Sequence, residues 1–243
     1  MERLNVTVEE YFEIYNYYYY DNFSLYQFFV DLKESYYKSD IRILLKMLNS
    51  LNIKSHCYKK LSPSTNNFLR LSVESYIFRL SNTLPKDYKI RIEQLYNYLE
   101  RVTIWGFFEI FLASSCAYLF NEKQLEKIGD KILPNISIYK NSSFIYEIAL
   151  TMLHNMIYAA LKNNFLSTAS LFLQYANGLE MTERLLPKKA CLNYDKGYYL
   201  ALIGLKDEGL KLMRQVYDFF ILIDEKNYTQ KMEIDISVLE KEN

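Results

Sequence analysis

The sequence has few of the residues that interrupt regular structure. Of its 243 residues, 6 are Gly and 4 are Pro. All-β proteins and βαβ proteins with glycine-rich loops use these turn residues far more often, so both classes are disfavoured. We therefore expect an all-α protein, and the length allows one sizeable core or one continuous core of stacked repeats.

The sequence also lacks an excess of charge of either sign. Lys and Arg together number 29, and so do Asp and Glu, which leaves a formal net charge of zero. Non-specific nucleic-acid binding depends on a basic surface field. We therefore expect this chain to bind no nucleic acid by itself.

Cysteine is scarce and widely spaced. Cys57, Cys116 and Cys191 form no CxxC pair and are odd in number. This pattern favours neither a disulfide framework nor a zinc site, so we interpret the three residues as buried, reduced thiols.

Uninterrupted apolar runs are also missing. The two most apolar stretches, 104–120 and 144–161, are broken by Glu109 and by Glu147 and His154. No apolar run follows a basic start at the amino terminus, so no secretory signal is visible. We expect a cytoplasmic protein with no membrane-spanning helix.

Sequence motifs of catalysis are absent as well. The chain contains no phosphate-binding glycine loop, no HExxH or GxSxG motif, no zinc-ligand spacing and no pair of catalytic acids. We expect no catalytic residues, no metal site and no cofactor, and therefore a protein that is not an enzyme.

What is present is a repeat of helix-start signals. Hydroxyl residues that can cap a helix precede long apolar-periodic runs near Ser24, Ser64, Thr103, Ser142 and Thr182, at spacings of 40, 39, 39 and 40 residues. In most units a second amphipathic run follows after a short polar break. Helical hairpins of this kind bury their apolar faces by stacking. We expect a right-handed superhelix of about five TPR-like helical hairpins.

Both ends of this array have their own signals. Thr7–Glu10 is a capping box, which predicts a helix over 8–20 and makes 1–22 a linker or leading helix. The segment 226–241 can form a terminal capping helix. The TPR-like regulatory domain itself would then span 23–243.

The segment from 142 to about 163 is apolar almost all round, which predicts a buried helix. Its polar exceptions are Glu147, Thr151, His154, Asn155, Tyr158 and Lys162. At about 100° per residue they share one sector of the helix, which predicts a lined groove. Alternatively, these groups satisfy one another and the neighbouring backbone inside the core.

Asn155 is the best candidate for holding a peptide, because its amide offers an acceptor and donors together. We expect Thr151, Tyr158 and Lys162 to line the same peptide site. The alternative for Asn155 is a buried amide bonded to an adjacent helix. His154 has no Ser, Cys or acidic residue at a spacing that implies nucleophilic or metal chemistry.

Two neighbouring units supply the remaining candidates. Trp105 and Glu109 would lie one turn apart on a helix over 103–119, and both are candidate peptide contacts. The lone acid Glu109 could instead pair with Arg70 or Arg79 of the preceding hairpin.

The fifth unit carries a mixed stripe of Arg184, Lys188, Cys191, Asp195 and Tyr199. Arg184 and Lys188 could bind a peptide carboxylate. The alternative is that both are ordinary solvated charges.

Three segments resemble the carboxy-terminal domain of the Rgg/GadR/MutR transcriptional regulators. They are LERVTIWGFFEIFLASSCAYLFNEKQLEKIGDKIL (99–133), LHNMIYAALKNNFLSTASLFL (153–173) and ERLLPKKACLNYDKGYYLALIGLKDEGLKLM (183–213). The similarity extends over most of the chain from about 60 to 225.

The resemblance implies a TPR-like domain, usually a homodimer, that binds a short peptide pheromone in the cytoplasm and controls an amino-terminal helix-turn-helix. Only Asn155 is carried over, as a clamp on the peptide backbone. The opening 4–18 looks like the end of such a DNA-binding head, so we expect the chain to lack that head. The alternative is a headless interaction or scaffold protein that heterodimerises with full-length regulators.

Overall fold

The computed structural model describes residues 25–52 and 61–241. These residues form eleven α-helices and no strand, so the expected all-α class is confirmed. The α-helices are α2 (Leu25–Tyr37), α3 (Ile41–Asn52), α4 (Pro63–Ser81), α5 (Tyr88–Arg101), α6 (Phe107–Cys116), α7 (Glu122–Ile132), α8 (Ser143–Lys162), α9 (Leu166–Asn177), α10 (Leu186–Leu202), α11 (Lys206–Leu222) and α12 (Lys226–Lys241). Three 3-10 helices complete the order: η3 (Ala117–Leu119), η4 (Leu133–Asn141) and η5 (Glu183–Leu185). The helix predicted over 8–20, and Cys57, lie outside the described residues.

Polar caps start the helices much as the sequence predicts. The Ser62 hydroxyl accepts the Thr65 N–H at 3.1 Å at the start of α4. The Ser142 hydroxyl accepts the Ile145 N–H at 3.5 Å at the start of α8. These bonds satisfy backbone donors that have no partner within the first turn.

The third helix start differs from the prediction. The helix α6 begins at Phe107, not near Thr103, and Trp105 therefore precedes the helix. The Gly106 N–H donates to the Glu109 carboxylate at 2.9 Å, so an acid in the first turn closes this end of the helix.

The chain divides into two compact units, one through Thr83 and one from Leu84. In the first unit α2, α3 and α4 pack on one another. The Tyr36 ring meets the Tyr76 ring edge-on, with ring centroids 5.0 Å apart. The division falls between α4 and α5, inside the second of the predicted hairpins.

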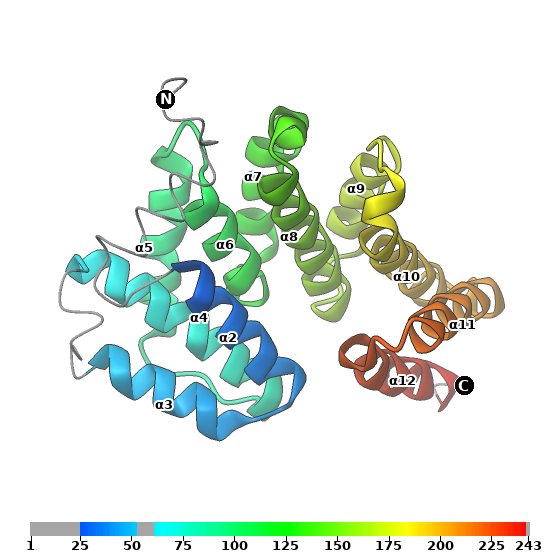
Figure 1. Ribbon diagram of the computed structural model, residues 1–243, viewed down its shortest axis with the longest axis horizontal. Coiled ribbons are helices and arrows are strands. Elements are labelled where there is room, and N and C mark those ends of the chain that lie inside the picture. The colour runs from blue at the N-terminus through cyan, green and yellow to red at the C-terminus, as the bar shows by residue number, and fades with distance from the viewer. Residues whose placement is uncertain (1–24, 53–60, 242–243) are drawn as a thin grey trace, which may run out of the picture. The chain divides into compact units, whose positions relative to one another are not determined.

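The second unit is a row of hairpins (Figure 1). Helix α6 packs on α8, and α8 packs on α10, so the first helices of successive hairpins are neighbours. The second helices α9 and α11 pack against α8 and α10, and α12 packs on α11 as the terminal helix. This arrangement confirms TPR-like hairpins followed by a terminal helix.

Helix α8 is the centre of this unit. Most of its side chains are buried, among them Leu153, Met156 and Ile157, and it contacts α6, α9 and α10. By length and composition alone, Phe144–Lys162 would be long and apolar enough to cross a membrane, but 61% of that stretch is buried within the protein. Such burial is typical of the core helix of a helical stack.

Helices α10 and α11 approach each other closely at two glycines. A Cβ atom added to Gly209 would lie 2.5 Å from the Gly197 carbonyl oxygen and 2.5 Å from the Ala201 nitrogen. Only glycine allows this approach, so the two helices pack closely along this line.

Candidate functional site

The candidate site is the polar stripe of α8, which we define as Glu147, Thr151, His154, Asn155, Tyr158 and Lys162. The first five side chains are partly exposed, whereas almost all the intervening residues of α8 are buried. The stripe therefore forms one line along a buried helix, as the sequence periodicity predicts. Its partners come from α6, α10 and α12.

Thr151 and Asn155 are the two neutral side chains of the stripe in its amino-terminal half. The Asn155 amide donates to the hydroxyl of Ser114 on α6 at 2.8 Å. The Thr151 hydroxyl donates to the Glu147 carbonyl of its own helix at 3.0 Å. Within the described part of the chain the Asn155 side-chain oxygen makes no hydrogen bond, so this amide keeps an acceptor for another group.

The middle of the stripe holds a histidine–aspartate pair. The His154 Nδ1 atom lies 2.7 Å from the Asp195 Oδ2 atom on α10, and Asp195 is fully buried. Burial raises the pKa of Asp195 to about 6; His154 opposes this rise and the negative charge of Asp235 adds to it. The second Asp195 oxygen, Oδ1, has no partner among the described protein atoms.

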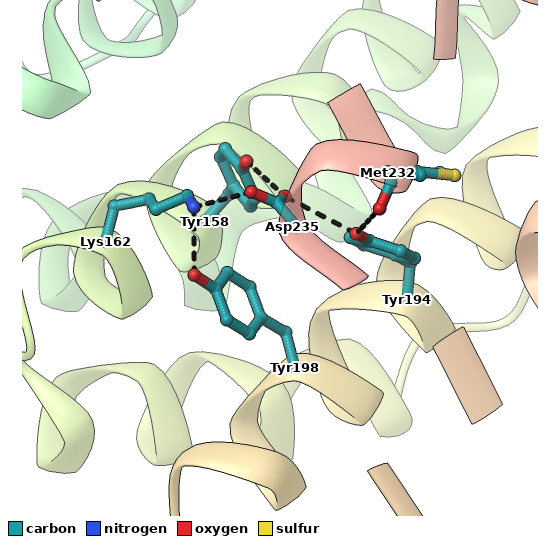
Figure 2. Close-up of polar contacts among 6 residues, drawn as sticks. All are labelled: Tyr158, Lys162, Tyr194, Tyr198, Met232 and Asp235. Atoms are coloured by element: carbon teal, nitrogen blue, oxygen red, sulfur yellow. Dashed lines mark hydrogen bonds and ion pairs between the residues drawn. The ribbon is translucent and has the colours of Figure 1, made fainter. Parts of the chain in front are cut away.

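The carboxy-terminal end of the stripe is charged and aromatic. The Lys162 ammonium donates to Asp235 of α12 at 2.6 Å and to the Tyr198 hydroxyl at 2.9 Å, as Figure 2 shows. The Tyr158 hydroxyl donates to the same Asp235 carboxylate at 2.5 Å. Burial opposes the charge of Lys162, but the Asp235 carboxylate and the Tyr198 hydroxyl more than offset it, so the pKa of Lys162 is raised.

A further phenol completes this arrangement. The hydroxyl of Tyr194, on α10, lies 3.4 Å from the Asp235 carboxylate and donates to the Met232 carbonyl at 3.2 Å (Figure 2). Burial, together with the nearby carboxylates, raises the pKa of Tyr194 well above its ordinary value, and burial does the same for Tyr158. Both phenols are therefore hydrogen-bond donors at neutral pH.

The remaining candidate residues of the fifth unit lie outside the contacts of Asp195 and Asp235. Arg184 is exposed in η5, just before α10. Lys188 lies 3.8 Å from the Glu147 carboxylate, so it reaches the amino-terminal end of the stripe. Cys191 is buried, as expected of a packed thiol.

Trp105 and Glu109 occupy different surroundings from those expected. Trp105 is only 3% exposed, and its indole N–H donates to the Leu99 carbonyl at 3.3 Å. The Glu109 carboxylate accepts hydrogen bonds from the Tyr98 hydroxyl and the Gly106 N–H. The placement of Trp105 and Glu109 on one helical face was wrong, because α6 begins after Trp105.

The repeat spacing could have identified some hydrogen-bond partners of the stripe residues that the sequence analysis did not name. Asn155 and Ser114 are 41 residues apart, and so are His154 and Asp195. One repeat separates equivalent positions of neighbouring hairpins, so stripe residues could have been matched to partners one repeat away. Asp235 is likewise 41 residues from Tyr194, but it is 77 residues from Tyr158 and 73 from Lys162, so matching positions one repeat apart finds the first of these partners and misses the other two.

The chain is similar in sequence to one protein family and in structure to several solved proteins. Residues 45–234 match the family described as "HTH-type transcriptional regulator Rgg, C-terminal domain". The crystal structure of the Streptococcus dysgalactiae SHP pheromone receptor Rgg2 is similar, with a TM-score of 0.72 and 16% sequence identity over 98% of this chain and 82% of that one. The crystal structure of RopB is also similar, with a TM-score of 0.62 and 19% identity over 95% of this chain and 98% of that one. At these identities, the structural matches show a shared fold.

Proposed function

This chain belongs to the family of Rgg C-terminal domains, and from that premise we propose that it binds a short peptide pheromone along the polar stripe of α8. The similar Rgg2 protein is described as a pheromone receptor, which supports this class of ligand. A stack of helical hairpins lined by polar side chains is a common surface for extended peptides.

The observation that carries the proposal is the combination of burial and unused bonding capacity on α8. Asn155 is partly exposed on a buried helix, bonds Ser114 through its nitrogen and keeps its oxygen unbonded. An amide in this position can pair with a peptide group of an extended ligand. In this proposal Thr151, Tyr158 and Lys162 flank the ligand. Arg184, which is exposed beside α10, meets one end of it.

Glu109 and Trp105 have a supporting role in this proposal. Glu109 caps the start of α6, the helix that carries Ser114, and Trp105, just before α6, bonds the Leu99 carbonyl of α5. Their own contacts are to neighbouring chain segments, so we assign direct ligand contact to the stripe of α8 and leave these two to position α6.

The proposed activity is regulation by binding, in the cytoplasm and as a homodimer. A peptide can shift the relative pose of subunits only if it binds two arrangements with different affinity. The domain boundaries proposed are a leading segment over 1–22 and the regulatory domain over 23–243.

Affinity selection tests the proposal. The purified chain is incubated with a pool of short synthetic peptides, and retained peptides are identified by mass spectrometry and titrated by calorimetry. We expect a subset to bind wild type and to lose affinity for Asn155→Ala. If no peptide is retained, the proposal is overturned in favour of a scaffold that pairs with full-length regulators, which co-purification with such a regulator would reveal.

A further inference from the structure

Helix α12 places one carboxylate against the charged end of the stripe. The carboxylate cradle, which we define as Tyr158, Lys162, Tyr194 and Tyr198, surrounds Asp235 (Figure 2). Lys162 and Tyr158 bond the carboxylate directly at 2.6 and 2.5 Å, and the Tyr194 hydroxyl lies 3.4 Å from it. Tyr198 bonds Lys162 and orients its ammonium.

The cradle is built without α12. Two of its residues come from α8 and two from α10, and these helices pack directly on each other. The His154–Asp195 contact joins the same two helices. The Lys162 ammonium also lies 4.9 Å from the centre of the Tyr198 ring. An ammonium and two phenol donors recognise any carboxylate, so the chemistry of the cradle is not specific for Asp235.

The distance along α8 fits an extended peptide. Asn155 and Lys162 are seven residues apart, which corresponds to two helical turns, or about 10 Å. An extended peptide covers this length with about three residues. A peptide held at its backbone by Asn155 would therefore reach the cradle with a group about three residues away.

We infer that the cradle binds a carboxylate of the peptide, either its terminus or an acidic side chain, and that Asp235 is the internal competitor for this position. This inference rests on the proposed function. Peptide binding then releases α12 from α8, while α12 keeps its contacts with α11. One carboxylate replaces another, so the partly exposed Lys162 ammonium retains a charged partner throughout the exchange.

A peptide carboxylate can enter the cradle only in molecules from which Asp235 has withdrawn. The apparent affinity of the protein for the peptide is therefore the intrinsic affinity multiplied by the fraction of molecules with a free cradle. Removing the charge of Asp235 should strengthen binding of carboxylate-bearing peptides by about tenfold. Removing the Asp235 charge should leave the affinity for peptides without any carboxylate nearly unaltered.

The test uses the full chain and three pools of short synthetic peptides. The first contains uncharged residues and a free carboxyl terminus, the second the same residues with an amidated terminus, and the third the amidated peptides with one glutamate. The variants are Asp235→Asn and Lys162→Met. Glu240→Gln is the matched control, because Glu240 also anchors α12, through its ion pair with Arg214, without touching the cradle.

We expect Asp235→Asn to raise retention of the first or third pool about tenfold over wild type, the pool that responds identifying the source of the carboxylate. Lys162→Met should remove the preference for that pool over the second. Hydrogen exchange of α12 in wild type should accelerate when a retained peptide is added.

Three results would overturn the inference. Retention indifferent to the carboxyl group in every variant would remove the cradle from the ligand site while leaving peptide binding intact. An equal gain in Glu240→Gln would mean that loosening of α12, and not competition by Asp235, controls binding. If no variant retains any pool, the proposed function fails and this inference fails with it.

Discussion

The middle of the polar stripe on α8 and its carboxy-terminal end differ in how many of their hydrogen-bonding groups the folded protein uses. In the middle, Asn155 makes one bond to Ser114 and keeps an acceptor unbonded. At the charged end, Tyr158 and Lys162 both bond a single carboxylate from α12. The amide of Asn155 keeps bonding capacity, whereas Tyr158 and Lys162 are already bonded to another part of the protein.

This difference follows from the cost of burying charge. A neutral amide with one bond loses little when a partly exposed acceptor stays unpaired, whereas the buried Asp235 carboxylate needs a cation as its partner. We therefore expect mutation of Lys162 to act mainly on stability and mutation of Asn155 to act mainly on ligand affinity.

Lys162→Met should have the largest effect on stability. It leaves the buried Asp235 carboxylate without its cation, which in a fully buried pair costs several kcal/mol. The Lys162 side chain is 32% exposed, so we expect a loss of about 3 kcal/mol, at the lower end of that range. Urea unfolding measures it.

The matched control is the double variant Lys162→Met with Asp235→Leu, which removes both charges and should recover most of the loss. A double variant as unstable as Lys162→Met alone would mean that packing of α12, and not the unpaired charge, is responsible.

The His154–Asp195 pair should make stability depend on pH. Burial raises the pKa of Asp195 from its ordinary 3.8 to about 6 in the folded protein. An acid whose pKa is higher in the folded than in the unfolded protein contributes stability that is fully present below its unfolded pKa. That contribution is lost as the pH rises through the pKa of the folded state. Relative to Asp195→Asn, wild type should therefore lose on the order of 2 kcal/mol between about pH 4 and pH 7.

Chemical unfolding at a series of pH values measures this difference. His154→Gln supplies a second arm, because removing the histidine takes away the group that opposes the raised pKa, so the loss should extend to higher pH. Parallel pH profiles for wild type and Asp195→Asn would contradict the prediction.

Asn155→Ala should weaken peptide binding more than it weakens the fold. Loss of an amide that holds one peptide group should lower affinity by about 1 to 3 kcal/mol, roughly five- to a hundredfold. The buried Ser114 hydroxyl also loses its partner, which should cost about 1 kcal/mol of stability.

Ser114→Ala is the control for that prediction, since it removes the same hydrogen bond from the other side. It should lower the melting temperature to a similar extent and leave peptide affinity intact. If instead Asn155→Ala lowers the melting temperature and peptide affinity stays unchanged, Asn155 is a packing residue and no ligand clamp.

Glu240→Gln should have the smallest effect. Its partner Arg214 is 61% exposed, and exposed ion pairs contribute little because water and salt screen them. We expect no measurable shift of the urea midpoint. A clear shift would mean that α12 is anchored mainly along its exposed side and that the cradle has a minor role.

The sequence by itself determined the helical class, the hairpin period and the position of the polar stripe. These features are local: capping hydroxyls such as Ser142 and the spacing of polar residues along α8 depend only on helix geometry. The pairing of Asn155 with Ser114 was also within reach, because neighbouring hairpins repeat every 39 to 40 residues along the chain.

The tertiary structure alone decided where Trp105 lies and what the charged end of the stripe binds. Two caps were possible for α6, the Thr103 hydroxyl and the Glu109 carboxylate. In the structure the Glu109 carboxylate accepts the Gly106 N–H, and α6 begins at Phe107. The meeting of Asp235 with Lys162, which are 73 residues apart, depends on how the terminal helix packs beyond the neighbouring hairpin. Sequence spacing determines which residues share a face, whereas contacts between elements distant in sequence depend on the packing of whole helices.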